Sequence, residues 1–278
     1  MKVQHFPNFD RISALAATTL LAYAMSRFVD LPVRTWGIEV WGVYFEVILN
    51  ANTVVSILVA GLTASGADWL IRQHPALHER STIQHWFVPG LMALVLGEIL
   101  NSLPPGVLWG IVFLIGAGLL LLVLLAEYVV VDANDLSYPL SVAGLTALSF
   151  ALFLVLAITL KNNDLRLVFL MPPLALSAGA ISLRYIYLRL NLQDNFSPEN
   201  ARMAFYAAFV IAIISGQMTV AFHYWALTPI GFGLALLGPS YALTNFIGNL
   251  TDGREIRQAM VEPALICFGL WLTALLLQ

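Results

Sequence analysis

The sequence predicts an all-α integral membrane protein, a polytopic bundle of about nine transmembrane helices that forms a single domain over residues 1–278. Hydrophobic residues make up 60% of the chain and charged residues only 10%, whereas about a quarter of a soluble globular chain is charged. The mean hydropathy is +0.84. Apolar runs of about 20 residues, the length that crosses a bilayer, recur along the whole chain.

Charge and cysteine content exclude several classes of protein. The 13 Lys and Arg are fewer than the 16 Asp and Glu, which gives a formal net charge of -3. Because no basic tract is present to hold a phosphate backbone, nucleic acid is excluded as a partner. The single cysteine, Cys267, excludes an intrachain disulfide or a Cys-based metal site. We expect membrane lipids as partners, other membrane subunits as a further class, and no cofactor.

The first span is predicted over Ile12–Val29 and is expected to be retained. Arg27, Asp30 and Pro32 follow its apolar core, where a cleaved signal peptide would have small residues at a cut site.

The stretch Thr35–Ile48 has a different pattern. Aromatic and β-branched residues alternate with Gly and Glu on both sides of Trp41-Gly42, which can turn the chain. This period of two predicts a small extracytoplasmic β-hairpin, whose rings Trp36, Trp41 and Tyr44 suit the headgroup layer. One over-long helix with an aromatic belt remains the alternative.

Eight further spans follow in order, separated by short polar or Pro/Gly-containing turns. Ser197-Pro198 and Thr228-Pro229 each combine a capping hydroxyl with proline at the first helical position, which predicts a helix start. Proline inside a helix also removes a backbone donor, so Pro172-Pro173 can kink its span. The predicted spans are Thr53–Ile71, Ser81–Ile99, Val107–Val131, Pro139–Leu160, Leu165–Leu190, Ala201–His223, Pro229–Ile247 and Ile256–Leu277.

Lys and Arg are distributed unevenly between the two predicted faces of the bundle. Nine of the 13 fall on the side of the N-terminus, and cytoplasmic segments carry the excess of these residues. The N-terminus is therefore predicted in the cytoplasm of a prokaryotic cell, in the plasma (inner) membrane. With nine spans, the C-terminus and the hairpin would lie outside.

Two stretches carry a family resemblance. Ser65-Gly-Ala-Asp-Trp-Leu-Ile-Arg-Gln-His-Pro75 is the first, and His223-Tyr-Trp225 followed by Pro229, Gly233–Gly238 and Tyr241-Ala-Leu243 is the second. They resemble an uncharacterised family of bacterial multi-pass membrane proteins, a domain of unknown function. The resemblance implies the topology over most of the chain and assigns no functional residue.

Four ionisable residues are predicted at similar depth near the cytoplasmic side: Asp68, Glu127, Arg184 and Glu262. A charge at the bilayer centre costs about 3 kcal/mol on insertion scales, so such groups usually face the protein interior and pair. We therefore expect Arg184 to pair with Glu262 or Glu127 in a polar cavity. The alternative is that each group extends to the headgroups or locks neighbouring helices together.

Two further polar residues lie within spans. Glu98 is close to the opposite surface, where it is either a boundary residue in contact with water or a proton-accepting carboxylate. Gln217 is deep in its span, where an interhelical hydrogen bond is expected and a ligand contact is the alternative.

Metal and phosphate chemistry have weaker support. His74 and His78, with His85 further on, lack an H-E-x-x-H pattern and are interpreted as solvated loop histidines, so no metal site is predicted. Asp132 and Asp135 have the spacing of carboxylates that hold magnesium-diphosphate in intramembrane prenyl transferases. A second acidic motif is missing, because Asp252 stands alone before Arg254.

No assembled catalytic set is found in the sequence. The leading hypothesis is therefore a non-enzymatic membrane protein, either a carrier of a small or lipidic solute or an accessory subunit of a membrane complex. The alternative is an intramembrane lipid-modifying transferase that uses the cytoplasmic carboxylates. A polar, water-reachable cavity would favour transport, and a tightly packed interior would favour the accessory role.

Overall fold

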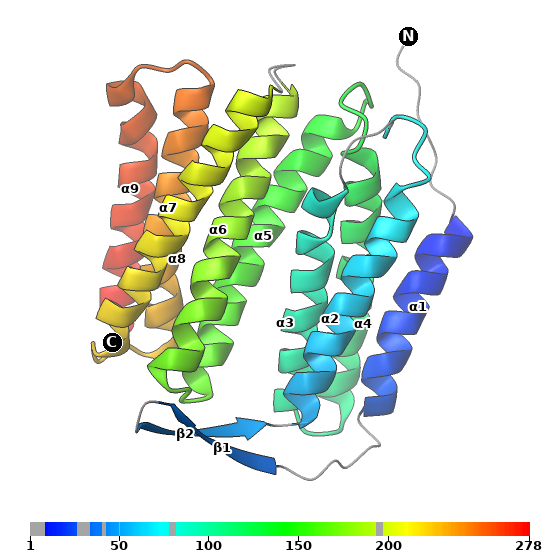
Figure 1. Ribbon diagram of the computed structural model, residues 1–278, viewed down its shortest axis with the longest axis vertical. Helices are drawn as coiled ribbons and strands as arrows, with labels where there is room; N and C mark the ends of the chain where they lie inside the picture. Colours follow the sequence, from blue (N-terminus) through cyan, green and yellow to red (C-terminus); the bar gives the residue numbers. More distant parts are fainter. Residues whose placement is uncertain (1–8, 27–33, 41–42, 50, 78–81, 193–196) are drawn as a thin grey trace. The chain divides into compact units, whose positions relative to one another are not determined.

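A computed structural model describes residues 9–26, 34–40, 43–49, 51–77, 82–192 and 197–278, and its helices dominate the chain (Figure 1). The chain divides into two compact units, Met1–Ser141 and Val142–Gln278. Each unit is described by itself.

Four long helices form the framework of the first unit: α1 (Phe9–Ser26), α2 (Ala51–Ile71), α3 (Phe87–Ser102) and α4 (Val107–Val129). A short 3-10 turn, η1 (Ile83–His85), precedes α3. Consecutive helices of this unit run in opposite directions (Figure 1), and α2 packs against both α1 and α3. Tyr23, Val59, Leu96 and Leu100 form a buried apolar cluster where α1, α2 and α3 meet.

Two short strands lie between α1 and α2. Strand β1 (Arg34–Val40) pairs antiparallel with β2 (Val43–Leu49), with Arg34 opposite Leu49 and Val40 opposite Val43. The predicted turn at Trp41-Gly42 lies outside the described residues.

The second unit is built from α5 (Tyr138–Asn162), whose first turn falls in the first unit, and from α6 (Leu167–Leu192), α7 (Pro198–His223), α8 (Pro229–Thr251) and α9 (Ile256–Leu276). Helix α6 packs on α7 and α8, and α9 packs on α8. Small residues allow close approach: a Cβ on Gly179 of α6 would lie 2.8 Å from the Cβ of Ala212 and 3.2 Å from the carbonyl oxygen of Ala208 on α7.

The membrane class predicted from composition is confirmed in its coarse form. Within the described residues, eight helical segments are long and apolar enough to cross a membrane, the first at Asn52–Ile71 and the last at Ile256–Leu276. The first predicted span, Ile12–Val29, corresponds to α1, which is not among these eight and has Asp10 and Arg11 in its first turn.

Both predicted proline-containing helix starts are confirmed. The Ser197 hydroxyl accepts a hydrogen bond from the Asn200 amide at 3.1 Å, and the Thr228 hydroxyl accepts one from the Gly231 amide at 3.1 Å. In each case proline follows the cap, so α7 and α8 begin where local sequence favours a helix.

Candidate functional site

The second unit contains a line of polar side chains between α6, α7 and α8, which we call the polar seam. Its members are Ser182, Tyr185 and Arg189 of α6, Ser215 of α7, Ser240, Thr244, Asn245 and Asn249 of α8, and Asp252 just after α8. The α6 members are spaced three and four residues apart, and so lie on one face of the helix.

An ion pair is located at one end of the polar seam. Arg189 Nη1 lies 2.8 Å from Asp252 Oδ2 and donates to Asn249 Oδ1 at 3.3 Å. The guanidinium also lies 4.9 Å from the ring centroid of Tyr185, within cation–π range. A Cβ on Gly248 would lie 2.5 Å from Tyr185 Cε1 and 2.9 Å from Arg189 Nη1. The glycine therefore provides the space that these two side chains occupy.

Neutral groups continue the polar seam towards the middle of α8. The Tyr185 hydroxyl donates to Asn245 Oδ1 at 3.0 Å, and the hydroxyls of Ser182 and Thr244 are 2.6 Å apart. The hydroxyls of Ser215 and Ser240 are 3.0 Å apart. Since these contacts join different helices, the polar seam holds α6, α7 and α8 together by hydrogen bonds between buried or half-buried groups.

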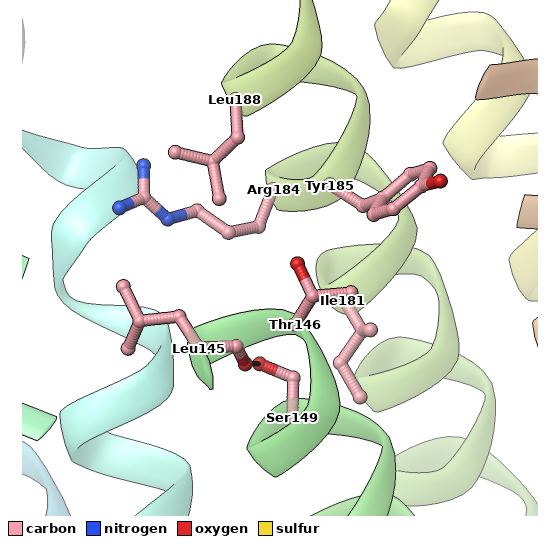
Figure 2. Close-up of a pocket in the computed structure, with 7 residues that line it drawn as sticks. All are labelled: Leu145, Thr146, Ser149, Ile181, Arg184, Tyr185 and Leu188. Carbon is pink, nitrogen blue, oxygen red and sulfur yellow. Dashed lines mark hydrogen bonds between the residues drawn. The ribbon is translucent and has the colours of Figure 1, made fainter. Parts of the chain in front are cut away.

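Arg184 lies on the other side of α6 from the polar seam. Figure 2 shows Arg184 and Tyr185 extending from α6 in opposite directions. Arg184 is 4% exposed and borders a small pocket between α5 and α6. Its lining residues are Leu145, Thr146, Ser149, Ile181, Arg184, Tyr185 and Leu188. The interior of about 10 Å³ is close to the minimum that one water molecule needs, so a solute would not fit without movement of the helices.

The four residues of the predicted cytoplasmic cluster are divided between the units. Asp68 and Glu127 belong to the first unit, and Arg184 and Glu262 to the second. Glu262 has an exposed side chain on α9 and interacts electrostatically with Tyr185 and Tyr241. The pairing of Arg184 with Glu262 or Glu127 stays a prediction.

Asp68 makes several hydrogen bonds at the end of α2. Its carboxylate accepts from Arg72 Nε at 2.7 Å, from Trp86 Nε1 at 3.0 Å and from the Thr82 hydroxyl. Two of these donors come from the segment before α3. Asp68 therefore joins the end of α2 to the start of the next helix.

Glu127 forms a buried pair with a histidine in the first unit. His85 Nδ1 lies 2.7 Å from Glu127 Oε2, with side-chain exposures of 3% and 1%. The interpretation of the histidines as solvated is wrong for His85 and for His74, which are 2% and 4% exposed. His74 packs edge-on against Tyr128 and accepts from the Ala76 amide at 3.1 Å. His78 lies outside the described residues.

The two remaining polar positions differ in their surroundings. Glu98 is half-buried near the end of α3, beside the hydroxyls of Ser56 and Thr53. Gln217 has an exposed side chain on α7, so its interhelical hydrogen bond and its ligand contact both stay predictions.

Asp132 and Asp135, the two aspartates considered for phosphate chemistry, stabilise a turn after α4. Asp132 Oδ1 accepts from the Asn134 amide at 2.9 Å, and Asp135 Oδ1 accepts from the Ser137 amide at 2.7 Å. These are local turn contacts of the kind that Asp side chains form with the backbone two residues on. Within the described part of the chain, no group of three or more His, Cys, Asp or Glu side chains could hold a metal ion.

The polar seam and the His85–Glu127 pair were missed at the sequence level. A signal for the seam existed, because Ser240 and Thr244 are four residues apart and Ser182 and Tyr185 are three apart. Each pair therefore lies on one face of its helix. Chemically, hydroxyl and amide groups in this arrangement exchange hydrogen bonds between helices. They do not assemble a nucleophile with an activating base.

Comparison with known proteins identifies a family. A family model described as "Protein of unknown function (DUF5656)" matches residues 31–277. No curated protein and no solved structure matches the chain.

Proposed function

The chain belongs to DUF5656, a family of unknown function, and we propose a role for it from the contacts of its own residues. The proposed role is that of a non-enzymatic, multi-pass accessory subunit of a membrane complex. The match over residues 31–277 confirms the resemblance to an uncharacterised family. The eight membrane-length helices support the membrane location.

One observation carries the proposal: the hydroxyl and amide groups of the polar seam bond to one another, and the pocket beside them is small. Ser182 bonds Thr244, Ser215 bonds Ser240, and Tyr185 bonds Asn245. Beside them, the pocket next to Arg184 encloses about 10 Å³. A solute carrier needs a cavity of several hundred Å³ with polar groups free to contact its ligand. Packed and satisfied groups instead support a structural role.

The first unit supports the same role. Two of its acidic side chains form contacts within the protein: Asp68 with Thr82 and Trp86, and Glu127 with His85. The transferase alternative needs Asp132 and Asp135 to coordinate a metal-diphosphate. Their hydrogen bonds to backbone amides favour a structural use of these carboxylates.

Several finer features belong to the same proposal. The excess of Lys and Arg on one predicted side supports a cytoplasmic N-terminus in a prokaryotic plasma membrane. The β1–β2 pair would then be an extracytoplasmic hairpin, and the C-terminus would lie outside if α1 also spans. Both units would form a single membrane domain, in which Arg184 pairs with Glu127 or Glu262.

The accessory role is tested by the size of the assembly in native membranes. The tagged full-length chain is extracted into polymer nanodiscs without detergent, and its mass is compared with that of the purified chain in the same discs. We expect a larger, stoichiometric assembly from the native membrane. A single 30.5 kDa chain surrounded only by lipid would contradict the proposal.

A flux measurement separates the accessory role from transport. Proteoliposomes that contain the chain are loaded with a pH-sensitive dye or with labelled lipid, and their leakage and flip rates are compared with those of empty liposomes. Equal rates are expected. Protein-dependent flux that is lost in a Thr244→Val variant, which removes one hydroxyl of the polar seam at similar volume, would favour transport.

A further inference from the structure

An oxygen-lined site surrounds Glu98, where the beginning of α2 faces the end of α3. One carboxylate oxygen of Glu98, Oε1, is enclosed by protein and has no hydrogen-bond partner among the described residues. The hydroxyls of Ser56 and Thr53 are neighbours of the carboxyl group, and Tyr23 of α1 interacts with it electrostatically. One oxygen of a half-buried acidic group is therefore enclosed here, next to neutral oxygen-bearing side chains.

Few hydroxyl protons at this site are available for donation to the Glu98 carboxylate. The Ser56 hydroxyl has one proton and donates it to the Asn52 carbonyl oxygen at 3.0 Å, while its oxygen accepts from Asn101 Nδ2 at 3.1 Å. The Tyr23 hydroxyl donates to the Ala93 carbonyl oxygen at 2.5 Å. Thr53 is thus the only one of these three hydroxyls whose proton is not already used.

An ionised carboxylate offers about four acceptor positions, so an ionised Glu98 would be under-satisfied at its enclosed oxygen, Oε1. Among the described residues, no Lys, Arg or His pairs with Glu98. The elements packed on α3 contribute Tyr23 from α1, hydroxyl and amide groups from α2, and apolar and indole side chains from α4, including Trp109 and Phe113. Burying an unpaired charge in such surroundings is costly.

A protonated carboxyl group resolves this deficit. Its own O–H can donate to the Ser56 or Thr53 oxygen, so that no neighbouring cation is needed and the Ser56 bond to Asn52 is kept. We propose that Glu98 is a proton-binding site, which holds a proton at neutral pH on a half-buried carboxyl group beside Ser56, Thr53 and Tyr23. This site is independent of the accessory role and adds a ligand, the proton, to the first unit.

Carbodiimide labelling tests the proposal in the full chain, reconstituted in lipid nanodiscs at neutral pH. Dicyclohexylcarbodiimide takes the proton of a protonated carboxyl group on nitrogen, and the carboxylate oxygen then adds to its central carbon to give an O-acylisourea. The acyl group of this adduct migrates from oxygen to nitrogen, which gives a stable N-acylurea of the same mass. We expect mass spectrometry to find the adduct on Glu98, with less adduct as the pH is raised. Glu199 and Glu255, whose side chains are exposed, are the internal controls and should remain unlabelled.

Infrared spectroscopy removes the dependence on reagent access. The spectrum should contain a C=O stretch of a protonated carboxyl group, and this band should disappear in the Glu98→Gln variant. The variant should keep the thermal unfolding midpoint of the parent, because Gln is neutral and has the same shape as protonated Glu. If neither the adduct nor the band is found at neutral pH, the proposal is wrong. Protection from labelling by sodium, but not by N-methylglucamine, would also overturn it and assign the site to a monovalent cation.

Discussion

The buried His85–Glu127 pair gives the sharpest test of how the first unit is held together. The contact is 2.7 Å long and both side chains are almost fully enclosed. Breaking such a buried pair typically costs about 3–5 kcal/mol, several times the roughly 1 kcal/mol that an ordinary hydrogen bond contributes. We therefore expect His85→Leu to destabilise the protein by about 4 kcal/mol, on the order of 10 °C in unfolding midpoint.

Glu127→Leu and the double variant His85→Leu/Glu127→Leu complete a double-mutant cycle, and Glu127→Gln is added as a milder substitution. Glu127→Gln keeps an acceptor for the histidine N–H and should lose only about 1 kcal/mol, the difference between a charged and a neutral hydrogen bond. The double variant His85→Leu/Glu127→Leu replaces both members of the pair by apolar side chains, so it should regain much of the loss. Thermal unfolding in one detergent, followed by circular dichroism, measures all of these, with the exposed Glu255→Gln as the control. Strictly additive losses of the two Leu substitutions would refute this reasoning.

Three other predictions concern packing, the cytoplasmic cluster and the turn after α4. Gly179→Ala places a methyl group 2.8 Å from Ala212 and should destabilise by about 1–3 kcal/mol, whereas Gly269→Ala, which has no neighbour within 4 Å, should be nearly neutral in the same melting assay. The losses of Arg184→Gln and Glu262→Gln should not add up in the double variant Arg184→Gln/Glu262→Gln if the two residues pair, and additive losses would exclude that pair. Asp135→Ala should lower the unfolding midpoint by a few degrees, because the Ser137 amide loses its acceptor. No change in that midpoint would leave the carboxylate without a structural role.

Much of the architecture was determined by local sequence. Apolar runs of about 20 residues fixed the membrane class, since a bilayer requires that length. Ser197-Pro198 and Thr228-Pro229 fixed two helix starts, because a cap and a proline act on the first turn of their own helix. Such signals depend on neighbours within a few residues, and a single sequence contains them in full.

The partners of the polar side chains were decided only by tertiary structure. His85 and Glu127 are 42 positions apart, and Ser182 and Thr244 are 62 apart. Periodicity places each residue on a face of its own helix, but it does not fix how that helix is rotated, or at what depth it meets its neighbours. Glycines such as Gly248 set those distances by leaving room for Tyr185 and Arg189. The sequence therefore determined which groups are costly to bury, and helix packing decided which groups satisfy them.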